Sequence, residues 1–95
     1  MSNHLSEEEL AAQLEQAKNQ VEIGAIYAHY RDPKNIYKVV GIGVIDATQE
    51  PGVIYKKERG SDFMKSVLWV RSIHIWLEQV TVEGTLVPRF QKVKN

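Results

Sequence analysis

The side chains best suited to chemistry lie on two short segments in which aromatic and basic residues alternate. In IYAHYR, an extended strand would place Tyr27, His29 and Arg31 on one face. In LWVR, the same alternation would point Trp69 and Arg71 outward. Aromatic rings, an imidazole and guanidinium groups can together stack on a ligand and bind an anion. These five residues therefore form our candidate ligand-binding surface.

Both segments also have an explanation that needs no ligand. A row of polar side chains is typical of the exposed face of a half-buried strand, where His29 would hydrogen-bond to a neighbour. The alternation in LWVR predicts that Leu68 and Val70 are buried. Trp69, on the other face, could then cover apolar surface of the sheet rather than contact a ligand.

The segment YKKERG places basic residues beside an aromatic ring. Tyr55, Lys56, Lys57 and Arg59 could contact the phosphates and bases of a single strand, which gives weak nucleic-acid binding as an alternative function. Lysines on an edge strand also discourage aggregation between sheets, and we favour this simpler explanation. Residues 25–95 carry 11 basic and seven acidic side chains, an excess that falls short of the basic stripe of dedicated nucleic-acid binders.

Catalytic and metal-binding motifs are missing from the sequence. There is no cysteine, which excludes disulfides, zinc–thiolate sites and thiol catalysis. His4, His29 and His74 are the only histidines, and their spacing does not bring two imidazoles to one metal ion. GIGVID lacks the third glycine and the following helix of a dinucleotide-binding loop, and no nucleophile elbow surrounds a serine. We therefore expect no enzyme, no metal and no cofactor.

An amphipathic helix is predicted at the N-terminus, in LSEEELAAQLEQAKNQV. Ser6 and Glu9 have the spacing of a capping box, and three consecutive glutamates suit the positive end of the helix dipole. A narrow apolar stripe follows, formed by Leu10, Leu14, Ala17 and Val21. We expect this stripe to dock on the rest of the chain, with a helix-mediated homodimer or an interaction arm as the alternative. We assign residues 1–23 to this helix and residues 24–95 to a β domain.

Beyond Gly24 the pattern becomes that of short strands separated by turns. Runs rich in Val, Ile, Tyr and Trp are separated by the turn sequences DPKN, TQEPG, RGSD and EGT. The predicted strands are residues 25–31, 36–46, 53–58, 67–71 and 78–82. Gly41 and Gly43 indicate a bulge in the longest strand. The failed alternation in SIHIWLE indicates a helical turn, capped by Ser72, before the last strand. Because closure removes exposed edges, we predict a small β-barrel with Trp76 plugging one end.

Four segments, IYAHYRDPKNIYKVVGIGVI, VIYKKE, LWVRSIHIWLEQVTVEG and VPRF, span about residues 24–90. In this order they resemble Domain of Unknown Function family 1653, a group of short bacterial proteins. The resemblance implies a compact SH3-like barrel without an established activity, and in such barrels residues like Tyr37 and Tyr55 often line a shallow groove. The family pattern usually has proline where this chain has Ser72 and an acidic residue where it has His74. The N-terminal helix is an extension beyond the resemblance.

The expected protein is mainly β, a small SH3-like barrel of about five strands with an N-terminal helix. We expect a non-catalytic binding module that recognises a protein segment or a small anionic ligand through Tyr27, His29, Arg31, Trp69 and Arg71. Weak nucleic-acid binding and assembly through the N-terminal helix are the alternatives. The acidic N-terminus lacks an apolar signal segment and no apolar run approaches a membrane span, so we expect a cytoplasmic protein without a membrane partner.

Overall fold

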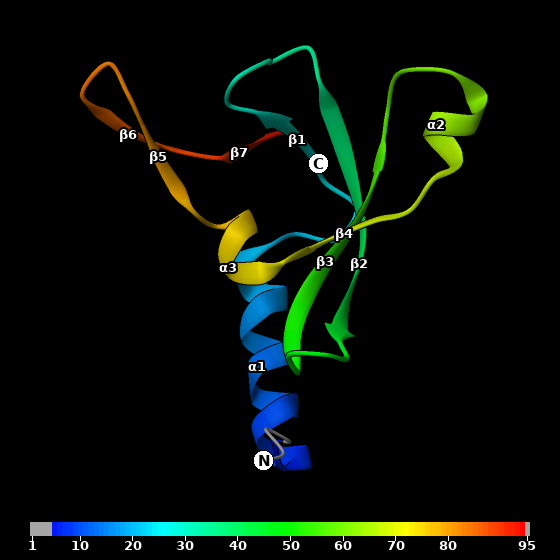
Figure 1. The fold of residues 1–95 in the computed structure, drawn as a ribbon, viewed down its shortest axis with the longest axis vertical. Coiled ribbons are helices and arrows are strands. Elements are labelled where there is room, and N and C mark those ends of the chain that lie inside the picture. The colour runs from blue at the N-terminus through cyan, green and yellow to red at the C-terminus, as the bar shows by residue number, and fades with distance from the viewer. Residues whose placement is uncertain (1–4, 95) are drawn as a thin grey trace.

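The chain forms an N-terminal helix, an antiparallel sheet and a separate β-hairpin (Figure 1). These elements are seen in a computed structural model that describes residues 5–94, so His4, one of the three histidines considered above, lies outside the described residues. In chain order the elements are α1 (Glu7–Gln20), β1 (Ile26–His29), β2 (Ile36–Ile45), β3 (Glu50–Lys57), α2 (Asp62–Ser66), β4 (Trp69–Ser72), α3 (Ile73–Trp76), β5 (Gln79–Val82), β6 (Thr85–Pro88) and β7 (Phe90–Lys94). No helix within the described range is long and apolar enough to cross a membrane.

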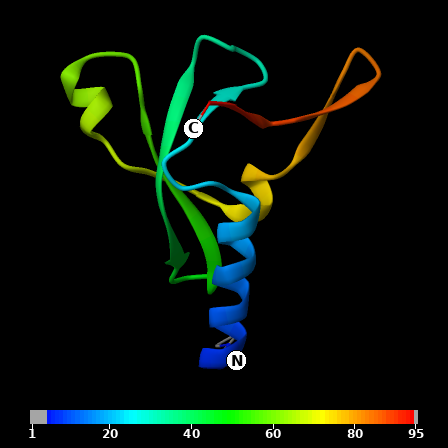
Figure 2. The ribbon, with the colours of Figure 1, turned by 180° about the vertical axis from the view of Figure 1, so that it is seen from behind.

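The main sheet has five strands in the order β4-β3-β2-β1-β7, and every neighbouring pair is antiparallel. Within residues 5–94, β4 and β7 each pair with one neighbour, so the sheet is open and the closed barrel that we predicted is not seen. The difference arises after α3. The predicted last strand becomes β5, which pairs with β6 in a hairpin that stands apart from the sheet (Figures 1 and 2). The strand beside β1 is instead β7, which we did not predict.

Helix α1 begins at the predicted capping box. The Ser6 hydroxyl accepts a hydrogen bond from the Glu9 backbone N–H at 3.1 Å, and the Glu9 carboxylate accepts one from the Ser6 backbone N–H at 2.9 Å. The helix packs against β2 and β3, alongside the hairpin that these strands form (Figures 1 and 2). Ala17 and Val21 are buried, and the two leucines of the stripe are half-buried. The apolar stripe therefore docks on the protein's own sheet, as expected.

An aromatic cluster forms the centre of the core. Trp76, at the end of α3, is 2% exposed and stacks face to face on Phe90 of β7 with 3.9 Å between ring centroids. Tyr27 and Tyr55 meet the indole ring at 5.4 and 5.1 Å. The predicted helical turn is confirmed as α3, with Ser72 at its N-cap but without a side-chain capping bond. The Trp76 side chain therefore packs against residues of β1, β3 and β7 in the centre of the core. It does not plug the end of a barrel, contrary to our prediction.

The longest strand, β2, is irregular where its glycines lie. The register of β2 with β3 shifts between Val39 and Gly41, so the predicted bulge is confirmed. A Cβ atom at Gly43 would lie 3.3 Å from Ile54 Cδ1, which means that the missing side chain leaves room for a neighbouring strand's side chain. The bulge adds to the bend and twist of the sheet.

The two faces of β4 are the reverse of the prediction. Trp69 pairs directly with Tyr55 of β3, and paired residues in an antiparallel sheet point to the same side. Because Tyr55 is buried, Trp69 and, two residues further, Arg71 lie on this inner face, which carries the core. Leu68 and Val70 point to the outer face of an edge strand, where they are 60% and 59% exposed. The expectation that these two residues are buried is therefore wrong.

Tyr27 is also placed differently. Three consecutive residues of β1, Ile26 to Ala28, are each 7% exposed, so this strand is covered on both faces. Alternation cannot identify an outward face in such a strand. Tyr27 packs on Trp76, and its hydroxyl accepts a hydrogen bond from the Glu22 backbone N–H at 3.0 Å. The predicted outward orientation of Tyr27 is therefore wrong.

Candidate functional site

The two edges of the open sheet approach each other at Arg71 and Phe90. Arg71 lies on β4 and Phe90 on β7, yet the guanidinium carbon is 5.3 Å from the centre of the phenyl ring. This contact requires the sheet to curl until its edge strands face each other across a seam. Arg71 Nε also donates a long hydrogen bond, 3.4 Å, to the Tyr55 hydroxyl. Among residues 5–94, no carboxylate lies within ion-pair distance of Arg71.

His29 faces the same phenyl ring from β1. Its imidazole meets Phe90 edge-on with 5.3 Å between centroids. Nδ1 accepts a hydrogen bond from the Arg31 backbone N–H at 3.1 Å, so the neutral ring carries its proton on Nε2. Partial burial lowers the pKa of this imidazole, and the positive charges of Arg89, Arg71 and Arg31 lower it further. At neutral pH, His29 is therefore an uncharged hydrogen-bond donor.

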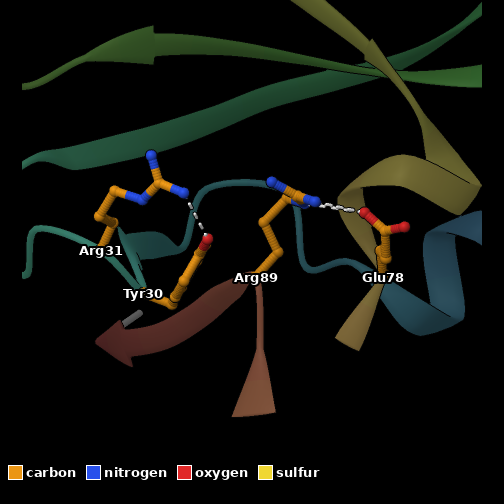
Figure 3. Close-up of polar contacts among 4 residues, drawn as sticks. All are labelled: Tyr30, Arg31, Glu78 and Arg89. Carbon is orange, nitrogen blue, oxygen red and sulfur yellow. Dashed lines mark hydrogen bonds and ion pairs between the residues drawn. The ribbon is translucent and has the colours of Figure 1, made fainter. Parts of the chain in front are cut away.

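A row of four side chains lies next to His29 and consists of Arg31, Tyr30, Arg89 and Glu78 (Figure 3). Arg31 Nη2 donates to the Tyr30 hydroxyl at 3.1 Å. Arg89 forms an ion pair with Glu78, in which Nε donates to Oε1 at 3.2 Å. Both guanidinium carbons lie near the Tyr30 ring, 5.6 and 5.9 Å from its centre. The Tyr30 and His29 rings are 4.9 Å apart, which connects this row to the seam.

Trp69 extends the inner face beside Arg71. Because the two residues are two apart on β4, their Cα atoms are separated by roughly 6.6–6.8 Å. Trp69 is 37% exposed, and the Lys57 ammonium lies 5.6 Å from its ring centre. An exposed indole near a cation offers a stacking surface. We refer to His29, Trp69, Arg71 and Phe90 as the seam site.

The residues of the predicted ligand-binding surface divide into three groups. His29, Trp69 and Arg71 belong to the seam site, where His29 and Arg71 both contact Phe90. Arg31 lies in the adjacent row, and Tyr27 lies in the core. Three of the five predicted residues thus lie together on the inner face of the curled sheet, and Tyr27 and Arg31 are not among them.

The residues of the predicted nucleic-acid surface do not share one face. Lys57 and Tyr55 are on the inner face, where Tyr55 is 5% exposed. Lys56, one residue away, points to the outer face, and Arg59 lies in the exposed turn after β3. The strand alternation therefore divides this basic cluster.

The tyrosines expected at a groove are core residues. Tyr37 is 8% exposed, packs edge-on against Tyr55 and Phe90, and accepts a hydrogen bond from Asn35 Nδ2 at 2.6 Å. Burial raises the pKa of the Tyr37 hydroxyl. Tyr37 and Tyr55 form the floor beneath the seam site instead of the walls of a groove.

Four residues of this region were not predicted: Tyr30, Glu78, Arg89 and Phe90. A signal was available, because HYR and VPRF are two of the segments that carry the family resemblance. The strand that contains Phe90 was missed because FQKVK is rich in polar residues. Its pairing partner is distant in sequence, since the register places His29 opposite Phe90. Only the paired strands reveal that these segments meet.

The seam site is an open surface. Two hollows, of about 540 and 460 Å³, lie elsewhere in the described part of the chain, one beside Glu22 and Lys92 and the other beside Ala17 and Leu77. In residues 5–94, no three His, Asp or Glu side chains are close enough together to hold a metal ion. The seam site offers one neutral donor, one guanidinium group and one exposed indole, and the adjacent row adds two further guanidinium groups, a combination suited to binding.

The fold and the site together define a small, mainly β domain with basic and aromatic side chains where its sheet edges meet. The chain belongs to the DUF1653 family, whose model, described as "Protein of unknown function (DUF1653)", matches residues 25–92. The chain is also similar to a DUF1653 protein from Bordetella bronchiseptica of known crystal structure, with 27% identity and a TM-score of 0.63. That match covers 79% of this chain and 91% of the other. None of the curated proteins compared with the chain matches it.

Proposed function

We propose that the chain is a non-catalytic cytoplasmic binding module that recognises an anionic group, on a small ligand or a protein segment, at the seam site. One observation carries the proposal: Arg71 is partly buried and, among residues 5–94, has no carboxylate partner. Fully buried guanidinium groups are almost always paired, and partial burial imposes part of the same free-energy cost on a charge without a partner. An anion bound from solution would supply that partner.

The surroundings of Arg71 support anion binding. Two further guanidinium groups, on Arg31 and Arg89, lie close enough to affect the charge of His29. His29 adds an Nε2–H donor without adding a charge. The Phe90 ring, itself stacked on Trp76, contacts the Arg71 guanidinium group, and this contact limits the side-chain entropy lost on binding.

We also propose that the sheet is an opened form of an SH3-like barrel. Five antiparallel strands, a bulge in the longest strand and a single helical turn after β4 all suit such a barrel. The contact between Arg71 and Phe90 bridges the two edge strands where hydrogen bonds would otherwise close the barrel. The site would then occupy the opening of the barrel.

Anion binding can be tested by titrating the full chain with inorganic phosphate and with acetate. Two-dimensional NMR would follow the Arg71 Nε–H and the His29 ring. We expect saturable shifts at both groups, and Arg71→Gln should weaken binding by at least about tenfold, because a hydrogen bond to a charged group is lost. Raising the salt concentration should weaken binding as well.

The matched control is Arg59→Gln, which removes the same charge from an exposed turn away from the seam. This variant should bind phosphate like the unmodified protein. Equal weakening in the Arg71→Gln and Arg59→Gln variants would show that overall charge, and not the seam site, attracts the anion. Shifts that never saturate would contradict a specific site.

A further inference from the structure

Anion binding accounts for Arg71 and His29 but leaves Trp69 unexplained. This indole is 37% exposed on the inner face, although the other tryptophan of the chain, Trp76, is 2% exposed. Trp69 and Arg71 share one strand and one face, with roughly 6.6–6.8 Å between their Cα atoms. A flat aromatic surface therefore lies directly beside a guanidinium group that has no carboxylate partner among the described residues.

We propose that the seam site binds a nucleoside monophosphate, with the base stacked on Trp69 and the phosphate held by Arg71 and the Nε2–H of His29. This inference rests on the proposed function, because it uses the same anion-binding groups. A nucleotide carries a planar ring and an anion at the two ends of a sugar. The sugar spans the distance between the stacking surface and the guanidinium group.

The charges around the site favour a phosphate over a carboxylate. Among residues 5–94, Arg31, Lys57 and Arg71 form no ion pair, and Arg89 pairs with Glu78. Four cationic groups therefore outnumber the two carboxylates of this region, Glu78, which is paired, and Asp32, whose charge also acts on His29. A phosphate monoester carries about −1.5 to −2 charges at pH 7, whereas a carboxylate carries one. The planar guanidinium group also matches two phosphate oxygens at once.

Lys57 adds a positive charge next to the Trp69 stacking surface. Its ammonium lies 5.6 Å from the Trp69 ring centre, on the strand next to β4. The ammonium lies over the ring, so a base that stacks on the same face of the indole would displace it to the edge of the base, where ring nitrogens and carbonyl oxygens accept hydrogen bonds. Stacking itself tolerates every base. We therefore expect a preference for nucleotides as a class, with affinities for different bases that differ by only a few-fold.

The test compares four probes on the full chain: inorganic phosphate, ribose 5-phosphate, adenosine and adenosine monophosphate. NMR of the two indole N–H groups distinguishes Trp69 from the buried Trp76. We expect adenosine monophosphate to bind at least about tenfold more tightly than ribose 5-phosphate and to shift the Trp69 indole signal. Trp69→Leu should remove this advantage and leave the affinity for ribose 5-phosphate unchanged. Val70→Ala, on the opposite face of the same strand, is the control that should change neither affinity.

The outcomes separate this inference from the proposed function. If ribose 5-phosphate and adenosine monophosphate bind equally and Trp69→Leu changes nothing, the stacking inference is overturned while anion binding stands. If no phosphate-bearing probe binds, both fail. If adenosine binds as tightly as its monophosphate, the phosphate has no role, and the inference is again overturned.

A nucleotide can be free or can stand at the end of a strand, and one further comparison distinguishes these sources. A short oligoadenylate with a 5′-phosphate should bind like adenosine monophosphate if one nucleotide unit fills the site. Affinity that rises with oligonucleotide length would identify a nucleic-acid strand as the source of that unit.

Discussion

The two tryptophans of the segment VLWVRSIHIW should contribute very differently to stability, and Trp76→Phe measures the larger contribution. Phenylalanine preserves a ring that can stack on Phe90, but it has three fewer ring atoms than the buried indole. At about 0.8 kcal/mol for each buried carbon, we expect the free energy of unfolding to fall by about 2 kcal/mol. A domain of this length is stabilised by about 5–14 kcal/mol in total, so the variant should remain folded. Its Tm should fall by about 8–16 °C.

Trp69→Phe is the matched control, because it makes the same chemical change at a position that is 37% exposed. Water can fill the space left at an exposed ring, so no cavity forms and we expect a loss of about 1 kcal/mol or less. Urea unfolding followed by far-ultraviolet circular dichroism measures both variants without depending on tryptophan fluorescence. Equal losses in the two variants would refute the assignment of Trp76 to the core and Trp69 to the surface.

Three further predictions concern the pH dependence, the helix and one turn. Burial and nearby arginines lower the pKa of His29 below its ordinary value of 6.5, so the unfolded chain binds the proton first as the pH falls. The contribution of the neutral His29 side chain to the free energy of unfolding is therefore complete above the unfolded-state pKa and is lost as the pH falls towards the lower folded-state pKa. Urea unfolding at several pH values should show that His29→Gln removes this pH dependence. An unchanged pH profile in the variant would contradict the assignment. Removal of residues 1–22 deletes the buried Ala17 and Val21, so the Tm should fall while light scattering shows the same oligomeric state; a loss of dimers would instead assign the helix to assembly. Gly24→Ala should lower the free energy of unfolding by about 1 kcal/mol, because Gly24 has a φ of +93°, and thermal unfolding that shows no loss would contradict this strain.

The features that could be predicted from the sequence are those determined by neighbouring residues. The capping box depends on two residues one helical turn apart, and both of its hydrogen bonds are present at Ser6 and Glu9. The bulge depends on Gly41, and α3 depends on the loss of alternation after Arg71. In each case the local residues have few alternative conformations, so the sequence pattern alone is sufficient to predict the structure.

The faces of the strands could not be predicted in the same way. Alternation separates Leu68 and Val70 from Trp69 and Arg71 correctly, yet apolar character assigns the wrong pair to the interior. The pairing of Trp69 with the buried Tyr55 determines which side is inner, and pairing depends on a strand distant in sequence. Hydrophobicity alone does not identify the inner face of an edge strand, because apolar side chains can remain exposed on the outer face while the inner face carries a guanidinium group over an aromatic ring.

The location of the seam site follows from the same long-range pairing. The segments HYR, LWVR and VPRF contribute His29 of β1, Arg71 of β4 and Phe90 of β7, and the contacts of His29 and Arg71 with the Phe90 ring bring these segments together. In a flat sheet with this strand order, β4 and β7 would be at opposite edges, and Arg71 could not reach Phe90. A closed barrel would join the two edge strands by backbone hydrogen bonds and leave no opening between them. The intermediate curvature of this sheet is therefore the condition for the site, and substitutions that flatten the bulge at Gly41 should weaken anion binding even though Gly41 lies outside the seam site.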